Sequence, residues 1–205
     1  MFCIHEVTMS KPRVFTREQV IETAFNLIRK NGWSTVSARS IAKELGSSTM
    51  PIYSHMKSLE ELEQELKVKT RALIIDYQSR TYSGNQLLDI AVGYVVFARE
   101  EKQLFRFLFI DRPDVSLSED VQSQQAQFYS QFGKESEKSK ELQEVPEYIQ
   151  KYLIQNSNIY THGLSMMVNA GIIQPCSDET IITYLQQAGE AFYLLGMSKE
   201  TVIHE

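Results

Sequence analysis

The sequence SARSIAKELGSSTMPIYSHMKS, residues 37–58, decides the fold. Its apolar residues at positions 38, 41, 42 and 45 repeat with the period of one helix face, and Ser37 stands where a helix N-cap belongs. Gly46 predicts the end of this helix, because glycine enters the left-handed backbone region at little cost. Two serines then lead into a second short helix at about 49–56. Two short helices joined by a tight glycine turn are typical of a helix-turn-helix unit.

Pro51 lies inside the second of these helices and is compatible with it. With Ser48 as the N-cap, the proline occupies the third helical position. The backbone N–H at that position has no partner inside a helix, so the missing N–H of proline removes no hydrogen bond. The prediction of a second helix therefore stands.

Helices are also predicted on both sides of this unit. Thr16 and Gln19 form a capping box, which predicts the start of an upstream helix, and Gly32 predicts its end. Downstream, Ser58 and the glutamate three positions later form a second capping box. This box predicts a long connecting helix over about 58–82.

The composition favours a globular, helical protein. The chain has 205 residues, of which 42% are hydrophobic, so disorder as the main state is excluded. Nine glycines and five prolines allow few turns, which favours long helices. The longest uncharged stretch, 152–177, is too polar for a lipid-facing span. Residues 1–8 lack the features of a secretory signal, and two cysteines are too few for a disulfide scaffold, so we expect a cytoplasmic protein without a membrane span.

The net charge of −5 conceals two parts of opposite charge. Residues 9–58 carry eight basic and three acidic side chains, whereas residues 59–205 carry 13 basic and 22 acidic ones. A small basic module therefore precedes a larger acidic one. Surface charge of this kind steers association, and the basic module is the part suited to nucleic acid.

The stretch TAFNLIRKNGWSTVSARSIAKELGSSTMPIYSHMKSLEEL, residues 23–62, resembles the DNA-binding head of the tetracycline-repressor (TetR) family. The similarity runs from about Phe15 to Leu66, and its most specific parts are SARSIAKELG, the two-serine turn and PIYSHMK. The resemblance implies an all-α protein. It places a helix-turn-helix DNA-binding domain at 9–57 and a larger helical domain for effector binding and dimerisation at 58–205.

The resemblance also implies roles for individual residues of the head. An arginine at position 39 suits guanine or a phosphate, and hydroxyl or thioether groups on the second helix suit base edges and thymine methyls. The alternatives are a solvated arginine and, at position 55, a capped surface histidine. The family usually has a lysine where this chain has Leu59, so Lys57 is the expected substitute for that phosphate contact. The residues assigned to DNA are Arg39, Ser48, Thr49, Met50, Tyr53, Ser54, His55 and Lys57.

The acidic part is predicted to form helices at about 87–100, 101–109, 118–134, 145–170 and 179–197. Its middle is rich in aromatic residues, which is compatible with a pocket, and the family resemblance implies an apolar or amphipathic small molecule as the ligand. The alternative is that these rings fill the core, since aromatic stripes at helical spacing usually pack. The candidate effector contacts are Tyr94, Phe97, Phe105, Phe109, Tyr129 and His162.

The last two helices are the predicted dimer interface. Their apolar residues repeat at near-heptad spacing, and a partner's pair would complete a four-helix bundle. A glycine on the first of the two helices would allow close approach. The alternative is a monomeric core. The candidate interface residues are Tyr160, Gly163, Met167, Ile181, Leu185, Ala188, Phe192 and Leu195.

No constellation of an enzyme is recognisable. The sequence has no phosphate loop, nucleophile elbow or zinc-binding helix, and its four histidines are scattered. We therefore expect no catalytic residue, no metal site and no cofactor. The expected function is a transcriptional repressor that binds a palindromic double-stranded DNA operator as a homodimer and is released by a small molecule. The alternative is a DNA-binding regulator that a protein partner controls, without a small-molecule ligand.

Overall fold

The computed structural model describes residues 15–113, 145–174 and 176–203. These residues form helices and no strand, which confirms the predicted all-α class. The chain divides into two compact units at Lys67, and the division falls inside one continuous helix. We call the unit up to Lys67 the head and the unit from Val68 the body. No helix in the described ranges combines the length and the apolar run that a membrane crossing requires.

The head contains α1, α2, α3 and the first part of α4, and their ends follow local signals. Thr16 caps α1 in the predicted box, in which its hydroxyl accepts the Gln19 N–H at 3.3 Å. Ser37 caps α2 in the same way, and Gly46 ends α2 in the left-handed region. The bounds are α1 Arg17–Asn31, α2 Ala38–Leu45, α3 Met50–His55 and α4 Leu59–Gln78.

Two details of the predicted helix ends are wrong. The N-cap of α3 is Thr49 and not Ser48, which moves Pro51 to the second position of the helix. A proline fits there equally well, because that N–H also has no helical partner. The α4 helix ends at Gln78 and not near residue 82, because the Tyr82 hydroxyl turns back to donate a hydrogen bond to the Tyr77 carbonyl at 3.1 Å.

A small apolar core holds the head together. Ile28 and Ile41 are fully buried, and each such side chain stabilises the fold by about 1.5–3 kcal/mol. The core takes residues from all four helices, so the two short helices are held by packing rather than by their own propensity. Its larger members are Val20, Phe25, Ile28, Ile41, Ile52, Met56, Leu62 and Leu66.

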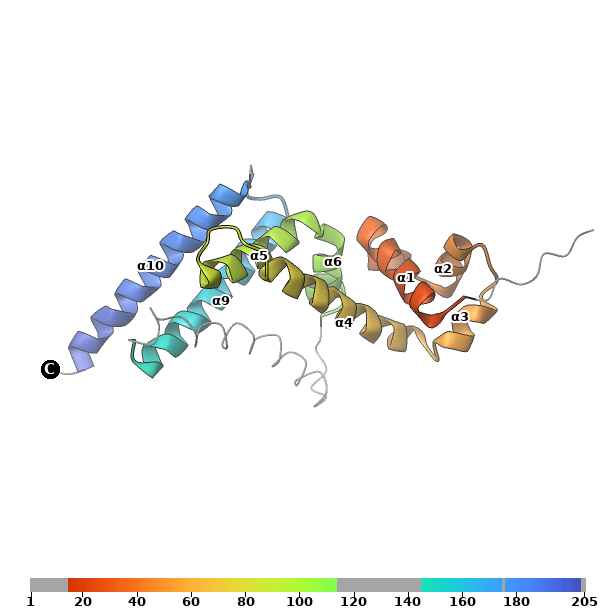
Figure 1. Cartoon of the computed structure of the whole chain (residues 1–205), viewed down its shortest axis with the longest axis horizontal. Coiled ribbons are helices and arrows are strands. Elements are labelled where there is room, and N and C mark those ends of the chain that lie inside the picture. Colours follow the sequence, from red (N-terminus) through yellow and green to blue (C-terminus); the bar gives the residue numbers. More distant parts are fainter. Residues whose placement is uncertain (1–14, 114–144, 175, 204–205) are drawn as a thin grey trace, which may run out of the picture. The chain divides into compact units, whose positions relative to one another are not determined.

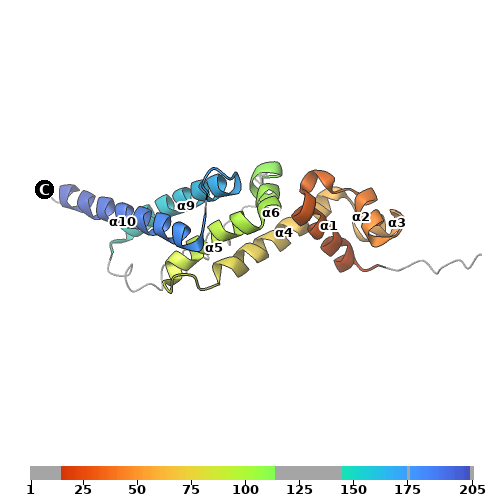
Figure 2. The same cartoon turned by 90° about the horizontal axis from the view of Figure 1, so that it is seen from above.

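In the described residues, the body comprises the rest of α4 and five further elements, shown in Figures 1 and 2. The α5 helix packs against both α9 and α10, which form a neighbouring pair running in opposite directions (Figure 1). Four predicted helices are confirmed, although the last one extends further, and the one at 118–134 lies outside the described residues. The elements are α5 Gln86–Glu100, α6 Lys102–Arg106, the π-helical turn η2 Phe107–Asp111, α9 Glu147–Asn169 and α10 Asp178–Ile203.

Close packing in the body depends on residues far apart in the sequence. Gly93 lies so near α4 that a Cβ atom there would be 2.3 Å from the Tyr77 carbonyl oxygen. The buried Asn169 amide donates to the Ala98 carbonyl at 2.9 Å and to the Lys102 carbonyl at 3.1 Å. These contacts join α4 to α5 and the end of α9 to the junction of α5 and α6.

Candidate nucleic-acid interface and ligand cavity

The turn between α2 and α3 leaves one side of both helices open to solvent. Met50 and Tyr53 are 78% and 64% exposed, although side chains of their size and apolar character are usually covered. Thr49 is exposed beside them, and Arg39 is exposed on α2. The structure thus brings hydroxyl, thioether, phenol and guanidinium groups to the surface of one helix-turn-helix unit.

The cations of this surface are available for a ligand. Within the described residues, neither the Arg39 guanidinium nor the Lys57 ammonium forms a hydrogen bond or a close ion pair, and Lys57 contributes only a weak attraction to the Glu61 carboxylate. Lys57 uses only its backbone N–H, which donates to the Glu61 carboxylate at 2.7 Å. Unpaired cations beside uncovered apolar groups are a chemistry that suits the grooves and phosphates of DNA.

Two predicted contact residues form hydrogen bonds inside the head. The His55 Nε2 lies 2.5 Å from the Phe15 carbonyl, to which it donates as an N–H. His55 therefore ties the end of α3 to the chain that leads into α1, which leaves only Nδ1 for a phosphate. The Ser54 hydroxyl donates to the Pro51 carbonyl at 2.7 Å. Ser48, the remaining predicted contact, is exposed in the turn.

A charged clamp that the sequence did not predict joins α1 to the start of α4. The Arg17 guanidinium bonds to the Glu61 carboxylate at 3.2 Å and to the Glu65 carboxylate at 2.8 Å. The Lys57 N–H and then Arg17 lower the pKa of Glu61. The same carboxylate is thereby drawn away from the predicted capping box, in which only the Ser58 hydroxyl takes its part by accepting the Glu61 N–H at 3.2 Å.

Four of the aromatic residues predicted for an effector form a ring cluster in the body. Phe105 and Phe109 have ring centroids 4.9 Å apart, and His162 lies 5.3 Å from Phe109. The Tyr94 hydroxyl is 3.0 Å from His162 Nδ1, and partial burial lowers the pKa of this histidine. Phe97 is fully buried against Tyr77 and belongs to the core. Tyr129 lies outside the described residues.

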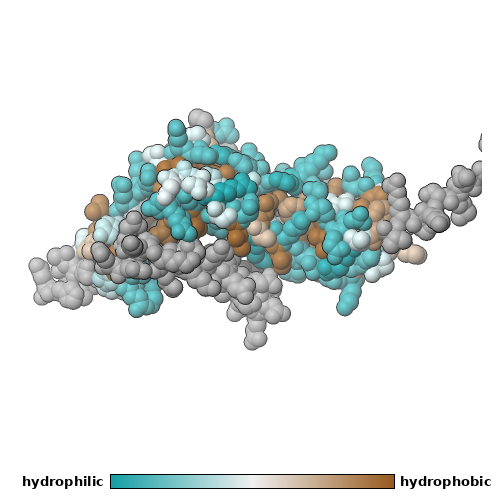
Figure 3. All heavy atoms as spheres, viewed as in Figure 1, coloured by the Kyte–Doolittle hydropathy of each residue, from teal (hydrophilic) through white to brown (hydrophobic). Residues whose placement is uncertain are grey.

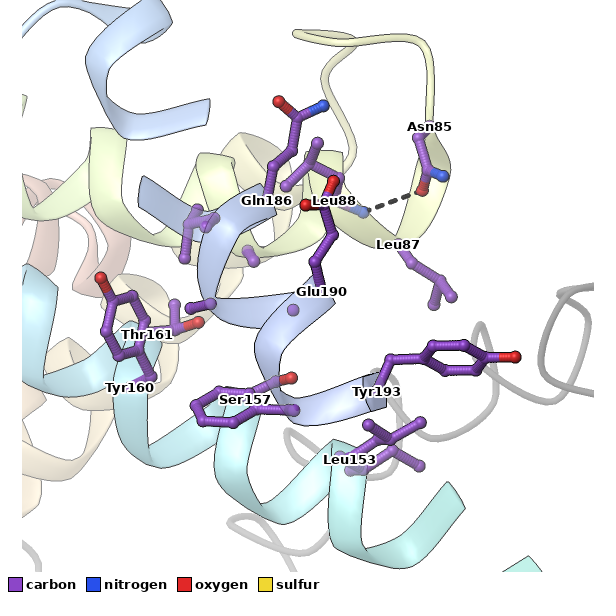
Figure 4. A pocket seen from close by; sticks show the side chains of 16 residues that line it. Asn85, Leu87, Leu88, Leu153, Ser157, Tyr160, Thr161, Gln186, Glu190 and Tyr193 are labelled. Atoms are coloured by element: carbon purple, nitrogen blue, oxygen red, sulfur yellow. Dashed lines mark hydrogen bonds between the residues drawn. The ribbon is translucent and has the colours of Figure 1, made fainter. Parts of the chain in front are cut away.

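A cavity of about 320 Å³ lies between the start of α5, the middle of α9 and the middle of α10 (Figure 4). None of the described residues predicted for the effector lines this cavity. Four of the residues predicted for the dimer interface do so instead: Tyr160, Leu185, Ala188 and Phe192. Its lining residues are Asn85, Leu87, Leu88, Ala91, Leu153, Ile154, Ser157, Tyr160, Thr161, Leu185, Gln186, Ala188, Gly189, Glu190, Phe192 and Tyr193.

The surface of α10 requires a correction to the predicted interface. Ile181 and Leu185 are buried in the chain's own core, and Phe192 packs on the buried cluster that begins α9. These three side chains face inward because α9 and α5 already cover that side of α10. Leu195, by contrast, is 48% exposed.

A stripe at the edge of this covered face of α10 is more accessible. Tyr184, Ala191 and Leu195 are exposed there, and the partly buried Ala188, which also lines the cavity, lies between them. The spacings of four, three and four residues are the repeat of a helix-packing seam. On α9 the predicted residues Gly163 and Met167 are also exposed, and Ile159 is 65% exposed in the same region. Among the described residues, a Cβ atom at Gly163 would meet nothing within 4 Å.

Comparison with known proteins identifies the fold. No family model matches the sequence. An uncharacterised HTH-type transcriptional regulator of Mycobacterium tuberculosis is 26% identical over 77 residues, which are 38% of this chain and about a third, 35%, of that protein. A TetR-like transcriptional regulator from Rhodococcus sp. RHA1 is 16% identical in sequence, and its crystal structure matches with a TM-score of 0.57, covering 88% of this chain and 96% of that one. The chain has the fold of a TetR-like transcriptional regulator.

The TetR-like fold confirms the resemblance drawn from residues 15–66. Both comparison proteins carry the names of transcriptional regulators and neither has the name of an enzyme, in agreement with the expected class. Sequence reasoning missed the cavity and the Arg17 clamp for one reason. Each joins residues from helices that are distant in the chain, and no local pattern pairs them. One local feature could have pointed to the cavity, namely Gly189, because a glycine inside a helix often has a packing or functional reason.

Proposed function

We propose that this chain is a transcriptional repressor that binds a palindromic operator as a homodimer and is released by a small molecule bound in the body. One observation carries the proposal. The α2–α3 surface presents unpaired Arg39 and Lys57 together with exposed Thr49, Met50 and Tyr53. Each of these groups has a counterpart in the major groove or on its phosphates.

The contacts divide into two kinds. The Arg39 guanidinium reads a guanine through O6 and N7, and the Met50 side chain reads a thymine methyl. The Lys57 ammonium and the Tyr53 hydroxyl hold phosphates, which positions the helix without reading sequence. A helix as short as α3 reads only a few base pairs, so two heads are required, about 34 Å apart on one face of the duplex.

The second copy docks on α9 and α10. The stripe from Tyr184 to Leu195 and the region around Gly163 offer apolar surface that the described residues leave largely uncovered. Two such pairs related by a two-fold axis form a four-helix bundle, in which Gly163 admits the partner's helix closely. This arrangement is the usual form of a symmetric dimer and matches a palindromic operator.

Release works through α4, which belongs to both units. A ligand in the body that favours one position of this helix changes the separation of the two recognition helices. A 100-fold loss of operator affinity requires that the ligand favour the released state by about 2.7 kcal/mol, a usual size for allosteric coupling. The same factor must appear as weaker ligand binding when the operator is present.

The test is the affinity for operator fragments, selected from random duplexes, as a function of salt. We expect Lys57→Ala to weaken all duplexes alike and to reduce the slope of log K against log salt by about 0.9. Arg39→Ala should relax the preference at one base pair, by about 1–3 kcal/mol. Lys30→Ala, which removes an exposed cation at the far end of α1, is the matched control and should change neither quantity. A salt-independent affinity would contradict the proposal.

The dimer is tested separately by the mass in solution. We expect Leu195→Glu to produce folded monomers, because it places a charge within the seam. Thr183→Glu adds the same charge on another exposed side of α10 and should leave the dimer intact. Dimers that survive Leu195→Glu at micromolar concentration would refute this interface.

A further inference from the structure

We propose that the cavity between α5, α9 and α10 binds a mainly apolar organic cation, whose charge is recognised by Glu190. The inference deepens the proposed function by naming the class of the effector and its site, and it rests on that function for the regulatory consequence. Four features of the described residues carry it: the lining, the charge, the aromatic rings and a glycine.

The cavity has the size and the lining of a small-molecule site. Its volume of about 320 Å³ is at the lower end of the usual range for ligand pockets, so the occupant is compact. Aliphatic side chains come from all three helices, with Leu88 from α5, Leu153 from α9 and Leu185 from α10. Because the lining is mainly aliphatic, a ligand that fits this cavity is mainly apolar.

Glu190 gives the cavity its charge. It is the one charged side chain among the described residues that line the cavity, and the described part of the chain offers it no hydrogen bond or ion pair. Figure 4 shows its carboxylate on the rim beside Gln186, on the side of Leu88. An apolar pocket with one unpaired carboxylate is complementary to an apolar molecule with one positive charge.

Aromatic rings in the lining also favour a cation. Tyr160 and Phe192 line the cavity with ring centroids 6.1 Å apart in an edge arrangement, and Tyr193 is 43% exposed at its mouth. The face of an aromatic ring attracts a cation within about 6 Å, most strongly where water is excluded. The rings and Glu190 are therefore two separate features of the lining that each favour a positively charged ligand.

The opposite choice, an anion held at the start of α5, conflicts with the structure. The Asn85 side chain already accepts the Leu88 N–H at 3.1 Å, as Figure 4 shows. The Asp89 carboxylate occupies the first turn of the same helix and accepts two hydrogen bonds from Ser83 at 2.6 Å. The Leu88 N–H is thus already bonded, and an anion at this helix end would meet the negative charges of Asp89 and Glu190.

Gly189 keeps the cavity open. It lies inside α10, where glycine costs about 1 kcal/mol relative to alanine, and a Cβ atom there would meet nothing within 4 Å. Helix packing in this chain thus gives no reason for the glycine. The space above it is part of the cavity, so a larger side chain at this position fills the site from inside.

The experiment uses three probes that share one phenylbutyl group and differ in the charge of the polar group attached to it. They are 4-phenylbutyltrimethylammonium, 4-phenylbutan-1-ol and 5-phenylpentanoate, each titrated into the full chain by calorimetry. We expect the ammonium to bind about ten-fold more tightly than the alcohol and the carboxylate to bind most weakly. Equal affinities, a preference for the carboxylate or no binding of the ammonium would each overturn the proposal.

Two variants locate the site. Glu190→Gln should remove the advantage of the ammonium over the alcohol, whereas Glu179→Gln, which neutralises an exposed glutamate outside the lining, should preserve it. Gly189→Leu should abolish binding of all three probes, and its melting curve reports whether the fold is intact. If Gly189→Leu unfolds the body, Glu190→Gln alone decides, and an unchanged advantage in that variant overturns the proposal.

A separate measurement distinguishes this inference from the proposed function. The ammonium probe is added to the protein bound to its selected operator, and release is followed by fluorescence anisotropy. Binding that depends on Glu190 without any release would leave the cation site intact and refute its role as the effector site. A chain that binds no operator would refute the proposed function, while the calorimetric comparison would still test the site.

Discussion

The head and the body differ in where the information for their structure lies. In the head, Thr16, Ser37 and Gly46 set helix ends through contacts with residues at most five positions away. In the body, the Tyr77 hydroxyl bonds to Glu100 and Glu101, and Asn169 bonds to carbonyls about 70 positions away. Local signals therefore define the head, whereas distant contacts define the body.

The two units also treat polar groups differently. The head leaves the Arg39 and Lys57 cations unpaired on its surface, whereas the body buries Asp89, Glu101 and Asn169 with hydrogen-bond partners. No buried side-chain nitrogen or oxygen in the described residues is without a partner. A surface that binds another molecule needs hydrogen-bond donors without partners in the protein. In the interior of a rigid unit, by contrast, buried polar groups need partners within the protein.

The largest expected effect is a loss of stability in the body, without a change in the stability of the head. Gly93→Ala would place a methyl group 2.3 Å from the Tyr77 carbonyl oxygen, so α4 and α5 must separate. We expect the free energy of unfolding of the body to fall by about 3 kcal/mol, because backbone cannot yield as a side chain does. Chemical denaturation followed by circular dichroism measures this loss.

Gly189→Ala is the control for this prediction. Its new methyl group enters open space, so we expect a stabilisation of up to about 1 kcal/mol from helix propensity. Equal effects at the two glycines would show that backbone freedom, and not close approach of α4 to α5, accounts for Gly93.

The fold of the head could be predicted because its signals are local. The Thr16 box, the Ser37 cap and the ends at Gly32 and Gly46 are confirmed. The cap of α3 was misplaced by one residue, because Ser48 and Thr49 are equally good caps by type. In the structure Thr49 has helical backbone angles and its side chain caps nothing.

In the body, the sequence predicted where the helices lie along the chain but not which residues of each helix are buried. Periodicity found α5, α9 and α10, but it places Ile181 and Leu195 on nearly the same face of α10, since 14 residues bring a helix round to within about 40°. Only the positions of α9 and α5 decide that Ile181 is covered and that Leu195 stays exposed. The cavity escaped prediction for the same reason, since it requires three helices to be placed first.

A smaller loss of stability is expected when a helix cap of the head is removed. Ser37→Ala removes the hydroxyl that accepts the Ser40 N–H at 3.1 Å, and we expect a loss of about 1 kcal/mol. The loss should appear as faster hydrogen exchange in α2 without a change in α5. Ser34→Ala, at an exposed position outside any cap, should leave both helices unchanged. Equal acceleration in the two units would show that the head does not owe its stability to local signals.

The smallest expected effect concerns His162, which joins the ring cluster of the body through Tyr94. Partial burial lowers the pKa of His162 below its usual value of 6.5, so the folded body prefers the neutral ring. The stability that depends on this neutral ring is present above the pKa of the unfolded chain. It is lost as the pH falls through the lower pKa of the folded state.

We therefore expect the free energy of unfolding of the wild type to decrease between pH 8 and pH 5 by slightly more than that of His162→Gln, which cannot titrate. The glutamine amide still offers a hydrogen bond to Tyr94, so the difference between the two pH profiles isolates the ring's charge. Because His162 lies at the exposed edge of the cluster, solvent screens that charge and keeps the difference small. Proton NMR titration of the imidazole gives an independent measure. An imidazole that titrated above 6.5 in the folded protein would reverse the sign and show that the phenol of Tyr94 stabilises the charged ring more than burial opposes it.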